Sequence, residues 1–145
     1  MTIGARDDQR SKVYKWERDF LFKSDEISFH DIQSYVNYVW QDMGLKYPPM
    51  VQEMPAQATT KGGDATRTVV RFPRYGSRKA VVLHELAHSM TGNIGGMSHR
   101  HGEKFVGVYM GLLEKYLNIP MPLLWYTAER DGVKYEKYAK PILVQ

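Results

Sequence analysis

The chain of 145 residues contains no cysteine. This absence excludes a disulfide framework, a thiolate metal site and a cysteine nucleophile. The sequence also has no long apolar run. No segment approaches the roughly 18 consecutive apolar residues of a membrane-spanning helix. Residues 1–8 include no apolar signal core. We therefore expect a cytoplasmic protein with no membrane partner.

Charge of one sign is only weakly in excess. The sequence has 20 lysine and arginine residues against 16 acidic residues, a net charge of +4. No run of five or six like charges occurs. Five basic residues gather in one segment, namely Arg67, Arg71, Arg74, Arg78 and Lys79. Such a group could contact phosphates, but solvent-facing strand residues are the favoured interpretation, so nucleic acid is not the expected partner.

Length and apolar content indicate one folded domain, residues 1–145, around one core. Helical periodicity predicts helices over about residues 6–23, 28–43, 78–90, 101–117 and 123–131. Ser28 with Asp31 predicts a capping box, and Ser77 predicts the N-cap of the third helix. His30, at the start of the second helix, is expected on the surface. No residue pattern specifies an oligomeric state.

Strand patterns are fewer and shorter. They predict strands over about residues 51–59 and 66–72, separated by a turn at residues 61–64. A third strand is expected at about residues 133–138, because a sheet of two strands is rarely stable. Together the elements predict an α+β fold in which a small, mainly antiparallel sheet packs with several helices.

The most informative segment is His84-Glu85-Leu86-Ala87-His88, which has the spacing H-E-x-x-H. On a helix, positions i and i+4 lie one turn apart on the same face, so two imidazoles can bind one Zn²⁺. Glu85 can flank the metal and take a proton from a water molecule. The apolar residues of this helix lie on the opposite side, so we expect the histidines to face a cleft.

A third ligand is expected because a catalytic zinc usually takes three protein ligands and a water. The helix predicted after the motif has an apolar stripe from Phe105 to Leu117. His101 lies one turn before this stripe and should face the neighbouring helix, so it is the preferred third ligand. His99 and a carboxylate such as Glu103 or Glu114 are the alternatives.

Two segments, His84-Glu85-Leu86-Ala87-His88 and His101-Gly102-Glu103-Lys104-Phe105, resemble the HExxH…HGxxF arrangement of SprT-like zinc metalloproteases. The start of the chain at residues 6–14, with Val82-Leu83-His84-Glu85 and Asp131-Gly132-Val133, more closely resembles a family of metallohydrolases from actinobacteria and their phages. The metzincin spacing is absent, because Ile94 stands where the third histidine would fall.

These resemblances imply a minimal zincin domain in a bacterial or phage-infected cell, with a small sheet, an active-site helix and a following helix that closes the metal site. They imply zinc held by His84, His88 and His101, with Glu85 as the general base. In zincins an edge strand above the active helix pairs with an extended substrate, so residues 66–72 become the expected substrate strand.

The sequence therefore predicts a zinc-dependent metallohydrolase, with a metallopeptidase acting on a protein or peptide as the leading hypothesis. Glu85 would pass the water proton to the leaving amine. The donor to the oxyanion is left open among Tyr75, Tyr109, Tyr116 and an arginine. A non-catalytic zincin-scaffold module, which binds a host protein or nucleic acid and holds zinc for structure alone, is the alternative. An accidental motif without metal is the third hypothesis.

Overall fold

Five helices and five short strands form in the described parts of the chain, which are residues 9–55, 62–92 and 100–142 of this computed structural model. The helices are α1 (Arg10–Leu21), α2 (Phe29–Asp42), α3 (Lys79–Met90), α4 (Glu103–Leu117) and α5 (Met121–Arg130). The strands are β1 (Glu26–Ile27), β2 (Met50–Glu53), β3 (Asp64–Ala65), β4 (Val69–Phe72) and β5 (Ser77–Arg78). The predicted α+β class is confirmed, and all five predicted helices are present.

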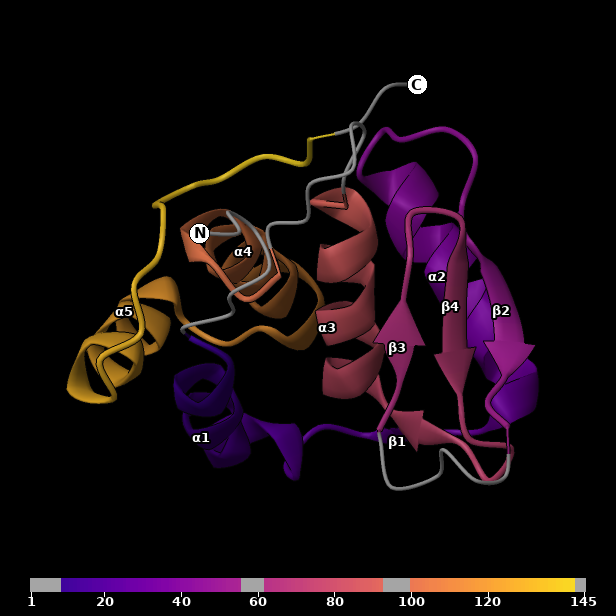
Figure 1. The fold of residues 1–145 in the computed structure, drawn as a ribbon, viewed down its shortest axis with the longest axis horizontal. Helices are drawn as coiled ribbons and strands as arrows, with labels where there is room; N and C mark the ends of the chain where they lie inside the picture. Colours follow the sequence, from indigo (N-terminus) through magenta and orange to yellow (C-terminus); the bar gives the residue numbers. More distant parts are fainter. Residues whose placement is uncertain (1–8, 56–61, 93–99, 143–145) are drawn as a thin grey trace, which may run out of the picture.

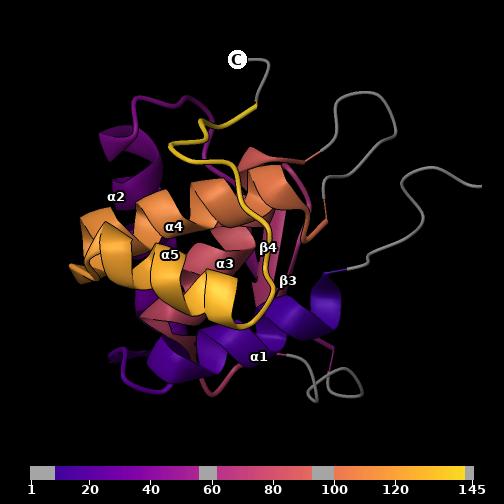
Figure 2. The same ribbon diagram turned by 90° about the vertical axis from the view of Figure 1, so that its left-hand side faces the viewer.

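Helix α3 lies at the centre of the molecule, with the sheet and α2 on one side and α1, α4 and α5 on the other (Figure 1). Seen at a right angle, α4 and α5 lie next to each other in front of α3 (Figure 2). Other elements therefore cover α3 on both sides, and nine of its side chains are buried. α1 and α4 pack beside its two histidines, of which His84 is buried and His88 is partly buried.

The larger sheet has the order β2-β4-β3. β2 runs parallel to β4, with Met50 opposite Val69, whereas β3 runs antiparallel to β4, with Asp64 opposite Arg71. The predicted substrate strand at residues 66–72 is therefore wrong, because β4 is the middle strand and both of its edges are paired. Residue 61 of the predicted turn at residues 61–64 lies outside the described residues, and Asp64 is the first residue of the outer strand β3. The predicted strand at residues 51–59 is present as β2, Met50–Glu53, and its residues 56–59 lie outside the described residues.

A second sheet, formed by β1 and β5, lies immediately before α3 and determines where this helix begins. Ile27 of β1 pairs with Ser77 of β5, so Ser77 is a strand residue and not the predicted N-cap. The N-cap is Arg78, without a side-chain hydrogen bond. The first amides of α3 instead donate to the segment after α1: the amide of Lys79 to the carbonyl of Asp25 at 2.9 Å, and the amide of Ala80 to Ser24 Oγ at 3.2 Å. Tertiary contacts thus replace a local cap.

Helix α2 begins after Ser28 and is followed by Gly44 at a φ of +76°, as its sequence predicts. Its capping box is not formed, because the hydroxyl of Ser28 donates to the carboxylate of Asp31 at 3.0 Å. His30 is exposed, as expected. Helix α5 has a proline in its first turn and is followed by Gly132 at a φ of +72°.

The segment after α5 is ordered without being a strand, so the predicted third strand at residues 133–138 is wrong. The amide of Glu136 donates to the carbonyl of Glu103 at 3.1 Å, and the amide of Ile142 donates to the carbonyl of Met90 at 2.8 Å. The segment therefore packs across α4 and reaches the end of α3 (Figure 2). Its close approach needs Gly107, where a Cβ atom would lie 2.1 Å from the carbonyl oxygen of Glu136.

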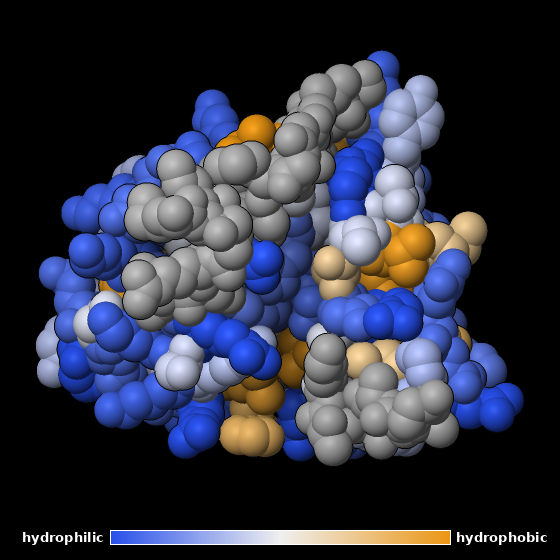
Figure 3. Space-filling model, viewed as in Figure 1, coloured by the Kyte–Doolittle hydropathy of each residue, from blue (hydrophilic) through white to orange (hydrophobic). Residues whose placement is uncertain are grey.

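The surface seen in Figure 3 is mostly hydrophilic, and apolar residues gather mainly over the sheet. Across residues 9–55, 62–92 and 100–142, none of the helices combines the length and apolar character needed to cross a membrane.

Candidate metal centre

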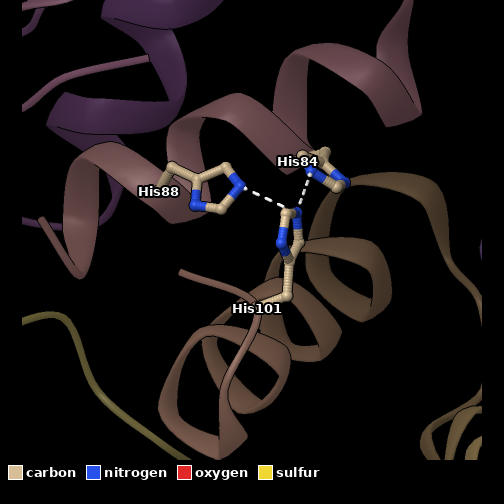
Figure 4. A group of neighbouring side chains, drawn as sticks. All are labelled: His84, His88 and His101. Carbon is tan, nitrogen blue, oxygen red and sulfur yellow. Dashed lines mark hydrogen bonds between the residues drawn. The ribbon is translucent and has the colours of Figure 1, made fainter. Parts of the chain in front are cut away.

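Three histidines from two parts of the chain meet beside α3. His84 and His88 lie one turn apart on α3, and His101 reaches them from the turn before α4 (Figure 4). The Nε2 atom of His101 lies 3.2 Å from that of His88 and 3.3 Å from that of His84. One potential ligand atom from each residue lies within 4.8 Å of the other two. The three predicted ligands are thus brought together.

The spacing of these nitrogens fits a metal ion. Nitrogen ligands held about 2.0–2.1 Å from a tetrahedral metal lie about 3.3–3.4 Å from one another. Two of the three separations match this value already. A cation shared by the three imidazoles is compatible with these short separations. The three histidines can therefore hold a metal ion.

His101 precedes the helical backbone of α4, and its main-chain carbonyl is held by a side chain. α4 begins at Glu103, with Gly102 as its N-cap, so the prediction of a helix reaching back to His101 is wrong by one half-turn. The side-chain amide of Gln9 donates to the carbonyl of His101 at 2.9 Å. Gln9 also accepts the amide of Lys134 at 2.6 Å. Gln9 therefore connects the turn that carries His101 to the segment after α5.

Phe105 packs among the three imidazole rings. It stacks on His88 with ring centroids 4.2 Å apart and meets His84 and His101 edge-on, each at 5.1 Å. Aromatic pairs in such geometries restrict the rotation of both rings. The first residue of the predicted apolar stripe therefore forms one wall of the candidate metal centre.

His88 is partly buried, and its pKa is lowered well below the usual value by that burial and by its two histidine neighbours. Its imidazole is consequently neutral near pH 7, which is the form that binds metal ions. His88 is thus in the form that can act as a metal ligand.

Glu85 is buried next to the histidines. Burial raises the pKa of its carboxyl to about 7, with Glu17 and Asp64 acting in the same direction and His84 in the opposite one. Strand β3 runs beside it, since a Cβ atom placed on Gly63 would lie 3.1 Å from Glu85 Cγ. A carboxyl group with this pKa can exchange protons near neutral pH.

Sequence reasoning missed Glu17, a buried acid on α1. Its Oε2 atom lies 2.8 Å from Nδ1 of His84 and accepts a hydrogen bond of 2.8 Å from the hydroxyl of Tyr109. A signal was present, because Glu17 occupies a position within the apolar stripe of Val13, Trp16 and Phe20, where a charged residue is unexpected.

Tyr14, also on α1, was missed as well. Its ring lies 5.2 Å from that of His101 and 6.0 Å from that of His84, while the side chain is 38% exposed. Among the tyrosines suggested by the sequence, Tyr109 is buried against Glu17 and Tyr116 donates to Asp42 at 2.6 Å. Tyr14 is therefore the tyrosine that flanks the histidines from the solvent side.

The alternative ligands divide into two groups. Glu103 and Glu114 are exposed and are not part of the group of close ligand atoms. His99 lies outside the described residues. In the part of the chain that the structure describes, His84, His88 and His101 form the one such group.

No family model, curated protein or solved structure matches the chain.

The five basic residues that the sequence places before α3 all have intramolecular partners. Arg71, Arg74, Arg78 and Lys79 pair with the carboxylates of Asp64, Glu53, Glu26 and Asp25, respectively. Arg67 donates to the carbonyls of Lys46 and Tyr47 and lies over the ring of Trp40. These pairings agree with the interpretation of this segment as structural surface residues.

Proposed function

We propose that this chain is a zinc-dependent hydrolase that cleaves peptide bonds. The observation that carries the proposal is the convergence of three imidazole Nε2 atoms from His84, His88 and His101 beside the buried carboxyl group of Glu85. Three protein ligands leave a tetrahedral ion one position for water or substrate, which is the arrangement of catalytic zinc sites.

The donor set supports the choice of zinc, because neutral imidazoles at tetrahedral spacing suit this ion. When bound, zinc would polarise the scissile carbonyl and make an adjacent water more acidic. Glu85 would receive the proton of that water and deliver it to the leaving amine. Burial raises the pKa of its carboxyl to about 7 in the ion-free site, and a bound dication would lower that pKa toward the ionised form that accepts the proton. A structural zinc site would have no use for such a base.

Strand β3 supports a peptide as substrate. It is an outer strand of the sheet formed by the described residues, and it lies against α3 beside Glu85. An extended peptide that adds to this edge would run past Glu85 through main-chain hydrogen bonds. The expected substrate strand is therefore β3 in place of β4.

Tyr14 would face the substrate from the opposite element, α1. Its ring contacts two of the three ligand histidines while its side chain remains accessible. A phenol there can donate a hydrogen bond to the oxyanion that develops as water adds to the carbonyl. The substrate is thus expected between α1 and the outer edge of β3.

The decisive experiment compares the native chain with Glu85→Gln on a library of unstructured peptides. The amide keeps the size of the side chain but cannot take a proton, so cleavage should fall by at least about 100-fold. Zinc content, measured on protein purified without a histidine tag, should stay near one equivalent.

Glu114→Gln is the matched control, because Glu114 is exposed on α4, and it should cleave like the native chain. Full activity in Glu85→Gln would contradict the role of the base. A native chain that binds zinc and cleaves no peptide would favour a structural site.

A further inference from the structure

The N-terminal helix α1 contributes a charged residue to the interior next to the ligands. Glu17 is 5% exposed, and its partners among the described residues are His84 and Tyr109, with no lysine or arginine. Removing a carboxylate from water costs several kcal/mol unless charge and hydrogen bonds compensate. Here both hydrogen bonds end on the same atom, Oε2. A neutral phenol and one imidazole are weak compensation for a purely structural buried acid.

The geometry decides which nitrogen of His84 carries the proton. A carboxylate oxygen accepts hydrogen bonds, so Nδ1 of His84 must donate to Glu17. In a neutral imidazole with a proton on Nδ1, the lone pair lies on Nε2. Nε2 of His84 is the atom that lies 3.3 Å from Nε2 of His101. The carboxylate thus selects the tautomer that can share a cation with the other two histidines.

Tyr109 fixes the carboxylate in turn. Its hydroxyl is fully buried, and its pKa is raised well above the usual value by burial and by the adjacent Glu17, so it stays a donor. The hydroxyl lies on α4, Glu17 on α1 and His84 on α3. Three helices therefore meet in one chain of hydrogen bonds that ends on a ligand nitrogen.

We propose that Glu17 is a positioning residue of the metal centre: it holds His84 through Nδ1, presents Nε2 to the ion and makes the imidazole a stronger ligand. Carboxylates behind a ligating histidine have this effect in metal sites generally. The proposal rests on the metal binding proposed above, but not on the hydrolysis. A divalent ion on the far side of His84 would also compensate the buried charge of Glu17.

The test measures zinc affinity by competition with a chromophoric chelator in the full chain. Glu17→Ala should weaken zinc binding by about 10- to 100-fold. Glu17→Gln should recover most of this loss, because its amide oxygen still accepts the Nδ1 proton. Tyr109→Phe should lie between Glu17→Gln and the native chain, since the His84–Glu17 hydrogen bond remains. The exposed Glu114→Gln should match the native chain.

Two further measurements distinguish the positioning of His84 by Glu17 from a general effect of Glu17 on protein stability. The visible absorption bands of the Co²⁺-loaded protein should change in Glu17→Ala, because they report on the ligand field. Nitrogen NMR of the metal-free native chain should show His84 with its proton on Nδ1, and this preference should be lost in Glu17→Ala. Should Glu17→Ala fail to fold, the nitrogen NMR of the metal-free native chain still tests the proposal, because a His84 proton on Nε2 instead of Nδ1 would overturn it.

Zinc affinity and Co²⁺ bands that stay native in both Glu17 variants, whatever happens to the melting temperature, would overturn the proposal. A native chain that binds neither ion overturns this proposal together with the proposed function. Native metal binding without peptide cleavage would leave the role of Glu17 standing and remove only the hydrolase.

Discussion

At the scale of single residues, the buried polar side chains of the described chain divide into two kinds. Three hydroxyl residues, Ser89, Thr91 and Thr127, donate to nearby main-chain carbonyls. The other four gather around one point, and they are Glu17, His84, Glu85 and His101. Burying ionisable groups is costly and is concentrated at functional sites. The distribution of these four residues is therefore the strongest residue-level mark of function.

Tyr14 provides the residue-scale prediction. Tyr14→Phe keeps the ring against His84 and His101 but removes the hydroxyl that would donate to the oxyanion, so kcat should fall by about 100-fold. KM and zinc content should stay close to native values, because neither depends on that hydroxyl. Steady-state kinetics on a cleaved peptide, with metal analysis of each sample, checks this.

The matched control is Tyr126→Phe, whose side chain is exposed on α5. Equal kcat values for both variants would show that the oxyanion donor is a different residue.

At the scale of elements, the positions of the helices follow from the local sequence pattern, whereas the positions and pairing of the strands do not. Each of the five helices has an apolar repeat or a clear stop such as Gly44 or Gly132, so its position is encoded within its own residues. The strands are two to four residues long. Their pairing is settled by partners distant in sequence, as in the parallel register of β2 with β4. Local alternation cannot specify such pairing.

Helix α4 carries the element-scale prediction, because two of its glycines differ in surroundings. In Gly107→Ala the new methyl group would lie 2.1 Å from the Glu136 carbonyl oxygen and 2.7 Å from Ala139 Cβ. The C-terminal segment must then shift, and we expect a loss of about 1–3 kcal/mol in the free energy of unfolding.

Gly111→Ala is the control, since a Cβ atom there meets nothing within 4 Å. It should raise the free energy of unfolding by about 0.5–1 kcal/mol through helix propensity. Urea denaturation of both variants measures the difference. A Gly107→Ala protein as stable as Gly111→Ala would contradict the close packing of the C-terminal segment on α4.

At the scale of the whole molecule, the candidate metal centre joins parts of the chain that are otherwise independent. Two ligands come from α3, one from the turn before α4, and the contacts that orient them from α1 and from Gln9. An ion held by these ligands binds the folded chain and not the unfolded one. Metal binding should therefore stabilise the entire fold by mass action.

The whole-molecule prediction concerns thermal unfolding. At free zinc about 100 times above Kd, the folded state gains about 2.7 kcal/mol, and each kcal/mol raises the melting temperature of a domain of this size by roughly 2–4 °C. Calorimetry with zinc and with a chelator measures the shift.

His101→Ala should abolish this zinc-dependent shift, whereas His30→Ala should keep it, because His30 is exposed on α2. A shift that survives in His101→Ala would show that zinc binds elsewhere on the chain.

Local patterns along the chain suffice to predict the helices, the α+β class and the grouping of three histidines with Glu85. The helical repeat places His84 and His88 on one face, and His101 lies one turn before the apolar stripe of the next helix. Both predictions depend only on the spacing of residues close together in the chain. Whether the three imidazoles meet depended on the packing of α4 against α3, which the structure provides.

What surrounds those residues depends on how distant segments pack together in the fold. The fold placed β3 in place of β4 at the outer edge of the sheet, and it packed α1 and α4 beside the histidines. It also brought Glu17 and Tyr14, some 70 residues earlier, against His84. Contacts between distant segments arise from burial and shape complementarity, which no local pattern records. The three histidines can therefore be read from the sequence, while the groups that surround them require the fold.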